Sequence, residues 1–252
     1  MTWPFRFMRV INNLKTLILD LLFPVSCFGC KKEGFFLCGG CRESLVWIPP
    51  KCFVCGRFVP GVGVVTIGRT CKFCRNKSLI YGFFSPFSYG DRIIRELVHS
   101  FKYSRVYSIA DLFAELLLKY FLDHRVVFGR TTLVIPTPLH KSRERIRGFN
   151  QAEALAEKLI YKFKNAGRND LDGLKKDILL RVKKTSPQVE LALTERRTNM
   201  INAFSLSEGA EVHGKDILLL DDVRTTGATM EEMARVLKMA GARRVYAVTV
   251  AH

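Results

Sequence analysis

Residues 217–230, which read ILLLDDVRTTGATM, constrain the fold of this chain more than any other stretch. The first four are apolar without alternation, as is typical of a central parallel strand that is covered on both faces. Asp221 and Asp222 follow directly, at the end of the strand where open α/β sheets bind their ligands. The stretch therefore predicts a parallel sheet with a polar site at the carboxyl ends of its strands.

A loop of small and hydroxyl-bearing residues follows the acidic pair and leads into a predicted helix. Exposed N–H groups at a helix N-terminus, together with hydroxyls, bind anions. Carboxylates beside such a loop fit a sugar phosphate, because they accept hydrogen bonds from ribose hydroxyls while the loop binds the phosphate. An ordinary strand–turn–helix joint is the alternative, but it needs only a capping residue. The residues of the loop are Arg224, Thr225, Thr226, Gly227, Ala228 and Thr229.

This pattern resembles the phosphoribosyl pyrophosphate (PRPP) loop of type I phosphoribosyltransferases. The resemblance implies that Asp221 and Asp222 hold the ribose hydroxyls and are the candidate catalytic residues, and that residues 224–229 bind the 5′-phosphate. It also implies Mg²⁺ carried with PRPP. Purine-salvage enzymes carry an acidic residue where Thr225 stands, and no general base is visible in this loop. The residues therefore support PRPP binding better than turnover.

A second predicted strand, residues 132–137, runs into a Pro-x-Pro turn and then into a very basic segment. Guanidinium groups at a strand end suit the leaving pyrophosphate, or a DNA phosphate. A generic basic loop is the alternative, and a helix is expected to begin near Gln151. The expected PRPP contacts of the turn are Pro136, Thr137 and Pro138, and the expected phosphate-binding arginines are Arg143, Arg145 and Arg147.

Every cysteine lies between residues 27 and 74, in C-x-x-C pairs. Such a turn directs two thiolates at one point, so two turns complete a tetrahedral zinc site. The pairs predict two structural Zn²⁺ ions, with sequential and cross-braced pairings both open. Partly empty sites are the main alternative, and the repetition is unlike a disulfide framework. The pairs are Cys27/Cys30, Cys38/Cys41, Cys52/Cys55 and Cys71/Cys74.

Residues 1–26 begin with a basic segment, and apolar residues then recur at helical spacing, which predicts an amphipathic helix. A signal peptide is a weaker interpretation, because Asp20 interrupts the apolar run and no A-x-A-like cleavage site follows. The run is also too short to span a bilayer. We expect the helix to pack on the chain's own core or on a partner, with membrane-surface binding as the alternative.

The remaining segments predict an ordinary globular domain from residue 79 onward. A polar stretch at 164–176 reads as a surface excursion, and residues 183–204 resemble a flexible lid over a phosphate site, or a mobile loop. A terminal strand–loop–helix–strand unit implies a parallel sheet with a right-handed crossover. The other predicted strands are 83–89, 178–182 and 245–250, and the other predicted helices are 91–102, 108–122 and 230–240, the last ending at Gly241.

The motifs IPTPLH, RIRGFNQAEALA and LLLDDVRTTGATM, preceded by the C-x-x-C array, together resemble the ComF family. That family combines a zinc ribbon with a phosphoribosyltransferase-like domain and is associated with competence. The resemblance implies an α/β fold, with a type I phosphoribosyltransferase-like parallel sheet flanked by helices. The expected divisions are the N-terminal helix at 1–26, a zinc-ribbon domain at 27–78 and the phosphoribosyltransferase-like domain at 79–252. As a departure, Asn202 stands where glycine is usual.

Two functions of different classes follow. The resemblance implies a cytoplasmic protein that handles single-stranded DNA during natural transformation, with a partner in the competence machinery such as a DNA helicase. The formal net charge of +17 fits this, since single strands bind through basic grooves and aromatic stacking. The alternative is an active phosphoribosyltransferase that transfers the phosphoribosyl group of PRPP to an unidentified acceptor.

Overall fold

The computed structural model describes residues 25–61, 67–103, 106–129, 131–183 and 200–252, and the chain divides into two compact units, Met1–Leu45 and Val46–His252. The predicted N-terminal helix and nearly all of the predicted lid lie outside the described residues. Along the described residues, no helix combines the length and the apolar character that crossing a bilayer requires.

The described part of the smaller unit, residues 25–45, consists of tight turns around cysteines and a short helix, α2 (Gly39–Glu43). Lys31 N donates to Cys27 O at 2.9 Å, and Cys27 N donates to Lys32 O at 2.8 Å, which closes the first C-x-x-C turn. The rings of Phe28 and Phe36 stack beside this turn, with centroids 6.5 Å apart. A segment with so few buried apolar side chains needs a further source of stability, which a bound metal supplies.

A parallel sheet of five strands forms the centre of the larger unit, in the order β1-β7-β6-β2-β3. All four neighbouring pairs are parallel. The prediction of a parallel sheet with flanking helices is therefore confirmed. The strands are β1 (Gly82–Phe84), β2 (Thr132–Pro136), β3 (Leu171–Leu174), β6 (Asp216–Val223) and β7 (Arg244–Ala251).

The strand β3 corrects the prediction that residues 164–176 are only a surface excursion. Leu171 is its one fully buried residue, and a register shift interrupts its pairing with β2 near Leu133. Gly173 has φ +118°, a conformation that a side chain rarely adopts. An exposed, irregular edge strand lacks the apolar run that marks a central one, so its composition is that of a loop.

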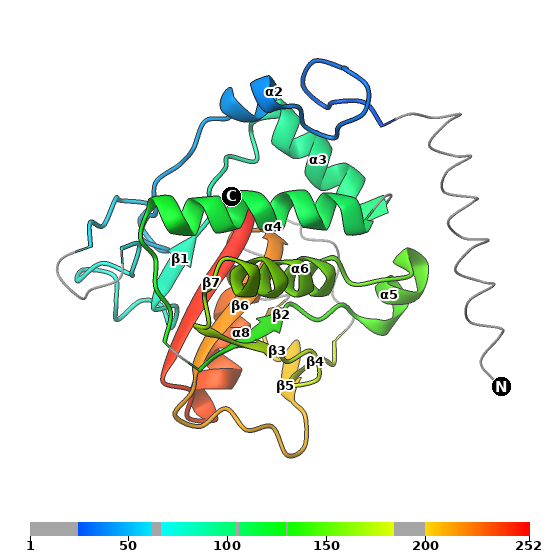
Figure 1. Ribbon diagram of the computed structural model, residues 1–252. Coiled ribbons are helices and arrows are strands. Elements are labelled where there is room, and N and C mark those ends of the chain that lie inside the picture. The colour runs from blue at the N-terminus through cyan, green and yellow to red at the C-terminus, as the bar shows by residue number, and fades with distance from the viewer. Residues whose placement is uncertain (1–24, 62–66, 104–105, 130, 184–199) are drawn as a thin grey trace. The chain divides into compact units, whose positions relative to one another are not determined.

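One face of the sheet is covered by α4 (Val106–Asp123) and α6 (Gln151–Asn165), as Figure 1 shows. Aromatic rings fill this layer: Phe121 of α4 meets Phe84 of β1 at 5.6 Å and Phe163 of α6 at 5.7 Å. The helix α3 (Arg92–Tyr103) precedes α4 and packs on it through Phe101 and Phe113. This aromatic core fixes the strands whose carboxyl ends carry the acidic pair.

The opposite face is covered by α8 (Ala228–Met239) and by a small antiparallel sheet of β4 (Leu179–Arg181) and β5 (Phe204–Leu206). Alternate residues of the central strands, such as Ile217 and Leu219, pack there against Met233 and Leu237 of α8. Phe53 belongs to the same core. It lies in the second cysteine-rich segment, which contains Cys52, Cys55, Cys71 and Cys74. That segment is therefore packed into the larger unit.

The basic segment after Pro138 forms a short helix, α5 (Lys141–Arg147), where the alternating arginines gave no helical signal. Ser142 N donates to His140 Nδ1 at 3.2 Å, which caps its N-terminus. Gly148, with φ +77°, ends it in the left-handed conformation typical of a helix C-terminus. These two residues explain why the segment is helical, and the helix decides which arginines share a face.

Candidate sugar-phosphate site

The carboxyl ends of β2 and β6 lie side by side, which brings the predicted Pro-x-Pro turn to the acidic pair. Pro136 is paired with Leu220, and Thr137 N donates to Leu220 O at 2.8 Å. The Thr137 hydroxyl is buried without a hydrogen-bond partner among the described residues. Because buried hydroxyls are normally satisfied, this one is a polar group that a bound ligand can satisfy.

The two carboxylates of the acidic pair lie in different environments. Burial raises the pKa of Asp221 to about 7, and the neighbouring Asp222 charge acts in the same direction. The Asp222 carboxylate instead lies 3.1 Å from Lys102 Nζ and accepts a hydrogen bond from Val223 N at 2.8 Å. The Asp222 carboxylate is thus paired with a cation, whereas burial favours the neutral form of Asp221.

Lys102, at the C-terminal end of α3, was not among the predicted site residues. Burial opposes its charged form, but the Asp222 carboxylate outweighs burial and raises the pKa of Lys102. Gln151 Nε2 donates to Lys102 O at 3.2 Å, and Arg147 Nη1 donates to Gln151 Oε1 at 3.1 Å. The residue pattern of α3 assigns Lys102 to the solvated face, and only the tertiary fold brings it to Asp222.

Two residues of the RGFNQ motif, Asn150 and Gln151, form hydrogen bonds with segments that carry the site. Asn150 Nδ2 donates to Thr137 O at 3.1 Å, while Asn150 Oδ1 accepts from Ala152 N at 3.0 Å and caps α6. Through Gln151 the same motif contacts α3. These contacts connect the turn after β2, the start of α6 and the end of α3. They give Asn150 and Gln151, the two amide residues of the motif, a structural role.

Arg181 of β4 is a second site residue that the sequence did not reveal. Its guanidinium lies 5.6 Å from the centroid of the Phe204 ring. Burial lowers the pKa of Arg181 to about 10, the Arg143 charge acts in the same direction, and Asp221 opposes both. Arg181 and Arg143 therefore form a positive environment that reaches Asp221, as a pyrophosphate site requires.

The three predicted phosphate-binding arginines do not act as one group. Because α5 is helical, Arg143 and Arg147 lie on the same face, and Arg145 lies on another and is exposed. Arg143 influences Arg181, whereas Arg147 donates to Gln151. A cleft of about 650 Å³ lies between this region and β4, and His140, Asn150 and Arg181 are among its lining residues.

The predicted phosphate loop precedes α8 as expected, with Gly227 at its N-cap position and Thr226 Oγ1 accepting from Ala228 N at 3.3 Å. The Arg224 side chain contacts Phe53. Its guanidinium lies 4.4 Å from the centroid of the Phe53 ring and donates through Nη2 to Phe53 O at 2.7 Å. Its backbone N–H donates to Ala251 O. Arg224 thus fastens the loop to the second cysteine-rich segment.

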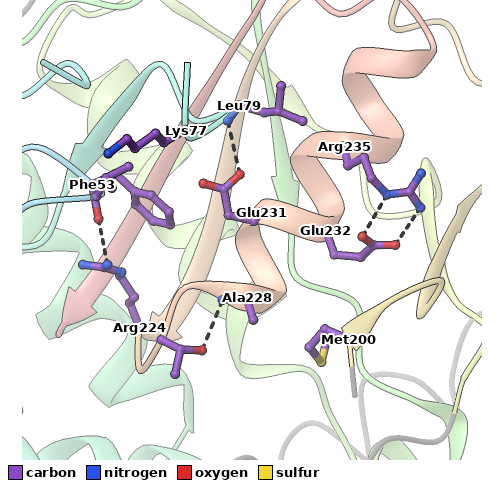
Figure 2. A pocket seen from close by; sticks show the side chains of 11 residues that line it. Phe53, Lys77, Leu79, Met200, Arg224, Ala228, Glu231, Glu232 and Arg235 are labelled. Atoms are coloured by element: carbon purple, nitrogen blue, oxygen red, sulfur yellow. Dashed lines mark hydrogen bonds and ion pairs between the residues drawn. The ribbon is translucent and has the colours of Figure 1, made fainter. Parts of the chain in front are cut away.

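A cleft of about 390 Å³ lies beside this loop, as Figure 2 shows. Phe53 and Arg224 line it together with residues of the first turn of α8. Glu231 of α8 accepts a hydrogen bond from Leu79 N at 3.2 Å, and Glu232 pairs with Arg235. Burial lowers the pKa of Arg224. The carboxylates of this cleft thus hold Leu79 and Arg235 in place.

The cysteines form two groups of four, and within each group the sulfur atoms all lie within 4.8 Å of one another. The grouping is sequential, with Cys27, Cys30, Cys38 and Cys41 in one and Cys52, Cys55, Cys71 and Cys74 in the other. None of the eight forms a disulfide bond. In the two groups, Cys38 N donates to Cys27 Sγ and Cys71 N to Cys52 Sγ, each at 3.4 Å. Four converging thiols are consistent with a structural zinc site in each group.

Two family models match this architecture. Residues 147–252 match the phosphoribosyl transferase domain, and residues 18–75 match the double zinc ribbon domain. The fold and the site thus define a phosphoribosyltransferase-type protein that carries a double zinc ribbon. The two predicted parts of the fold, a phosphoribosyltransferase-like parallel sheet and a zinc ribbon, are both confirmed.

Three relatives show to which family of such proteins the chain belongs. Competence protein F of Haemophilus influenzae is 30% identical over 227 residues, which cover 87% of this chain and 86% of that protein. Competence protein ComFC of Bacillus subtilis is 29% identical over 206 residues, covering 80% and 77%. DNA utilization protein YhgH of Escherichia coli K12 is 32% identical over 151 residues, covering 59% and 63%. The chain belongs to the ComF family, as its motifs predicted.

Proposed function

We propose that this protein binds a PRPP-type sugar phosphate between the ends of β2 and β6, and that it handles incoming single-stranded DNA during natural transformation. The observation that carries the first part is the acidic pair itself. Lys102 holds Asp222, and the Thr137 hydroxyl is buried with no hydrogen-bond partner among the described residues. The predicted phosphate loop follows β6, the strand that carries the acidic pair. The relatives named for competence and for DNA utilization support the second part.

Each residue of the site has a role in this proposal. The carboxylates of Asp221 and Asp222 accept hydrogen bonds from the ribose hydroxyls, and the loop from Thr225 to Thr229 binds the 5′-phosphate. Arg143 and Arg181 neutralise the pyrophosphate. Carboxylates are ligands that Mg²⁺ accepts, and the ion, when bound with PRPP, supplies further charge neutralisation of the pyrophosphate oxygens.

A transferase is the second candidate, and one observation favours it. A general base works best when its pKa lies near the working pH, and burial brings the pKa of Asp221 to about 7. Asp221 in its ionised form would accept the proton of an acceptor nucleophile as pyrophosphate leaves the sugar carbon. The loop itself has Thr225 where purine-salvage enzymes carry an acidic residue, so Asp221 is the available group.

Calorimetric titration of the full chain with PRPP, with and without Mg²⁺, tests the binding proposal. The wild type should bind, and Asp222→Asn should lose at least about tenfold in affinity, the equivalent of a charge-assisted hydrogen bond. Asp172→Asn is the matched control, because Asp172 is exposed on the edge strand β3. Equal affinities of the wild type and Asp222→Asn would refute the assigned site.

Pyrophosphate release separates binding from turnover. If the protein is a transferase, PRPP and a panel of amines and nucleobases should yield pyrophosphate with at least one acceptor, and Asp221→Asn should abolish it. If PRPP binds and no acceptor gives release, the site serves binding alone. In either case we place the protein in the cytoplasm, where thiols stay reduced and available to zinc.

A further inference from the structure

A second charged cleft, of about 360 Å³, lies away from the acidic pair. It is formed by the second cysteine-rich segment, the C-terminal part of α8 and the start of β7. None of its lining residues is acidic. The cationic residues that line it are Arg69, Lys72, Arg75, Lys238, Arg243 and Arg244.

Only part of this charge is neutralised by the protein. Arg243 forms a two-pronged ion pair with Asp216, with Nε–Oδ1 at 2.8 Å and Nη2–Oδ2 at 2.7 Å. Lys238 Nζ donates to the carbonyl oxygen atoms of Ala242 and Arg243. Among the described residues, the remaining four cations of the cleft have no carboxylate within ion-pair distance. Among the described residues, the cleft therefore carries more cations than the carboxylates around it pair with.

Two aromatic rings accompany these cations, the exposed ring of Phe73 and the half-buried ring of Tyr81. Phe73 lies between Lys72 and Arg75 in the chain and is 70% exposed, and Lys72 Nζ lies 5.1 Å from the centroid of its ring. Arg244 lies 4.9 Å from the centroid of the Tyr81 ring. Cations together with an exposed aromatic ring are the combination through which proteins bind single-stranded nucleic acid.

The cleft is held in place by the sheet and by the second cysteine group. Thr70 N donates to Tyr81 O at 2.8 Å, and Tyr81 N donates to Val245 O at 2.7 Å, so the cysteine-rich segment is fastened to the start of β7. Lys72 and Phe73 lie between Cys71 and Cys74, two members of one metal-binding group. The cationic side chains thus project from a rigid frame.

This cleft and the sugar-phosphate site lie at opposite ends of the sheet. Arg244 begins β7, whereas Thr249 of the same strand is paired with Asp221. A strand rises ~3.3 Å per residue, so Arg244 and Thr249 are separated by about 17 Å along β7. A single PRPP molecule cannot occupy both, and the basic cleft requires a ligand of its own.

We propose that this cleft binds the phosphate backbone of single-stranded DNA, with a base stacking on the exposed ring of Phe73 beside it. Cations spread along an open cleft suit a chain of phosphates, whereas a small anion needs convergent donors. The assignment rests on the proposed DNA-handling function and adds the place: the DNA binds at the amino end of β7, and the sugar phosphate binds at the carboxyl end.

Fluorescence anisotropy with a labelled oligothymidylate, measured over a range of salt concentrations, tests this assignment. Lys72→Glu combined with Arg244→Glu should weaken binding about tenfold or more at low salt. It should also lower the slope of log K against log salt by about 1.4, from ~0.7 for each lost phosphate contact. PRPP affinity and zinc content should stay at wild-type values, which shows that the frame and the distant site are intact.

The matched control is Lys119→Glu combined with Lys164→Glu, which makes the same change in net charge at exposed positions of α4 and α6.

Retained DNA binding in the control, together with its loss in the cleft variant, supports the cleft as the DNA site. Equal loss in both variants, or loss only in Arg145→Glu, overturns the cleft while leaving the DNA-handling function standing. If the wild type shows no salt-dependent binding, both proposals fail. Binding to phosphatidylglycerol vesicles alone, sensitive to the cleft variant, overturns the DNA assignment in favour of a lipid surface.

Discussion

The ring of Phe53 lies so close to Gly227 that a Cβ atom on this glycine would be 2.6 Å from Phe53 Cζ. Phe53 follows the first cysteine of the second group, and Gly227 belongs to the phosphate loop. The same ring lies beneath the Arg224 guanidinium. The second cysteine group is therefore a structural support of the loop, and its metal and the loop's conformation should be coupled.

Gly227→Ala should distort the phosphate loop. The substitution is strained twice, because Gly227 has φ +83° and because the added methyl group collides with Phe53. We expect a loss of about 1–3 kcal/mol in the free energy of unfolding and a marked loss of PRPP affinity. Denaturant unfolding and calorimetric titration measure the two effects.

Gly209→Ala is the control for this substitution. Gly209 has φ +73°, but a Cβ atom there would meet nothing within 4 Å. It should show only the backbone strain and leave PRPP affinity unchanged. If both variants behave alike, the contact with Phe53 has no influence on the loop.

Loss of metal from the second cysteine group should weaken PRPP binding without any change in the site residues themselves. Cys52→Ser removes one ligand from the group that positions Phe53, and Phe53 contacts Arg224 and Gly227. We expect one zinc ion fewer per chain and lower PRPP affinity. Cys27→Ser, in the group of the smaller unit, should remove one zinc ion and leave PRPP affinity unchanged. Equal losses of affinity would show a general effect of unfolding.

The pKa of Asp221 makes stability depend on pH in a defined direction. Its pKa rises from 3.8 to about 7 in the folded protein, so between these values the folded state binds more protons than the unfolded state. The contribution of Asp221 to stability must therefore fall as pH rises from about 4 to 7, and then stay constant. Asp221→Asn should remove this fall and should be more stable than the wild type at pH 8. Unfolding curves of the two proteins across this range, compared as a difference, measure the effect, and parallel curves would contradict it.

Much of this architecture could be predicted because its signals are local. The apolar run before Asp221 indicates a buried parallel strand, and the spacing of the C-x-x-C pairs indicates metal groups, although the sequential pairing needed the structure. The ComF motifs are local in the same sense. In each case, a few adjacent residues carry the physical constraint.

The residues that could not be predicted depend on the tertiary fold. Lys102 is 120 positions from Asp222 in the numbering, and only the packing of α3 beside the sheet makes them an ion pair. Arg181 belongs to a three-residue strand, and its proximity to Arg143 depends on α5 being helical. Arg224 lies in the predicted phosphate loop, but its guanidinium donates a hydrogen bond to Phe53 O, 171 positions away. Position in a motif indicates where a backbone lies, and it does not fix where a long side chain points.

Lys102→Met tests whether the ion pair with Asp222 matters for the site. The side chains of Lys102 and Asp222 are 25% and 14% exposed, so removal of the ammonium leaves a poorly solvated carboxylate without its cation. Loss of one member of a largely buried pair costs up to about 3 kcal/mol in stability, and the Asp222 carboxylate loses the cation that holds it in place. PRPP affinity, measured by calorimetric titration, should fall because the acceptor carboxylate is no longer positioned. Lys119→Met is the control, since Lys119 and Asp123 form an exposed pair and such pairs contribute about 0–1 kcal/mol. Equal PRPP affinities of Lys102→Met and Lys119→Met would mean that the ion pair with Asp222 has no influence on the site.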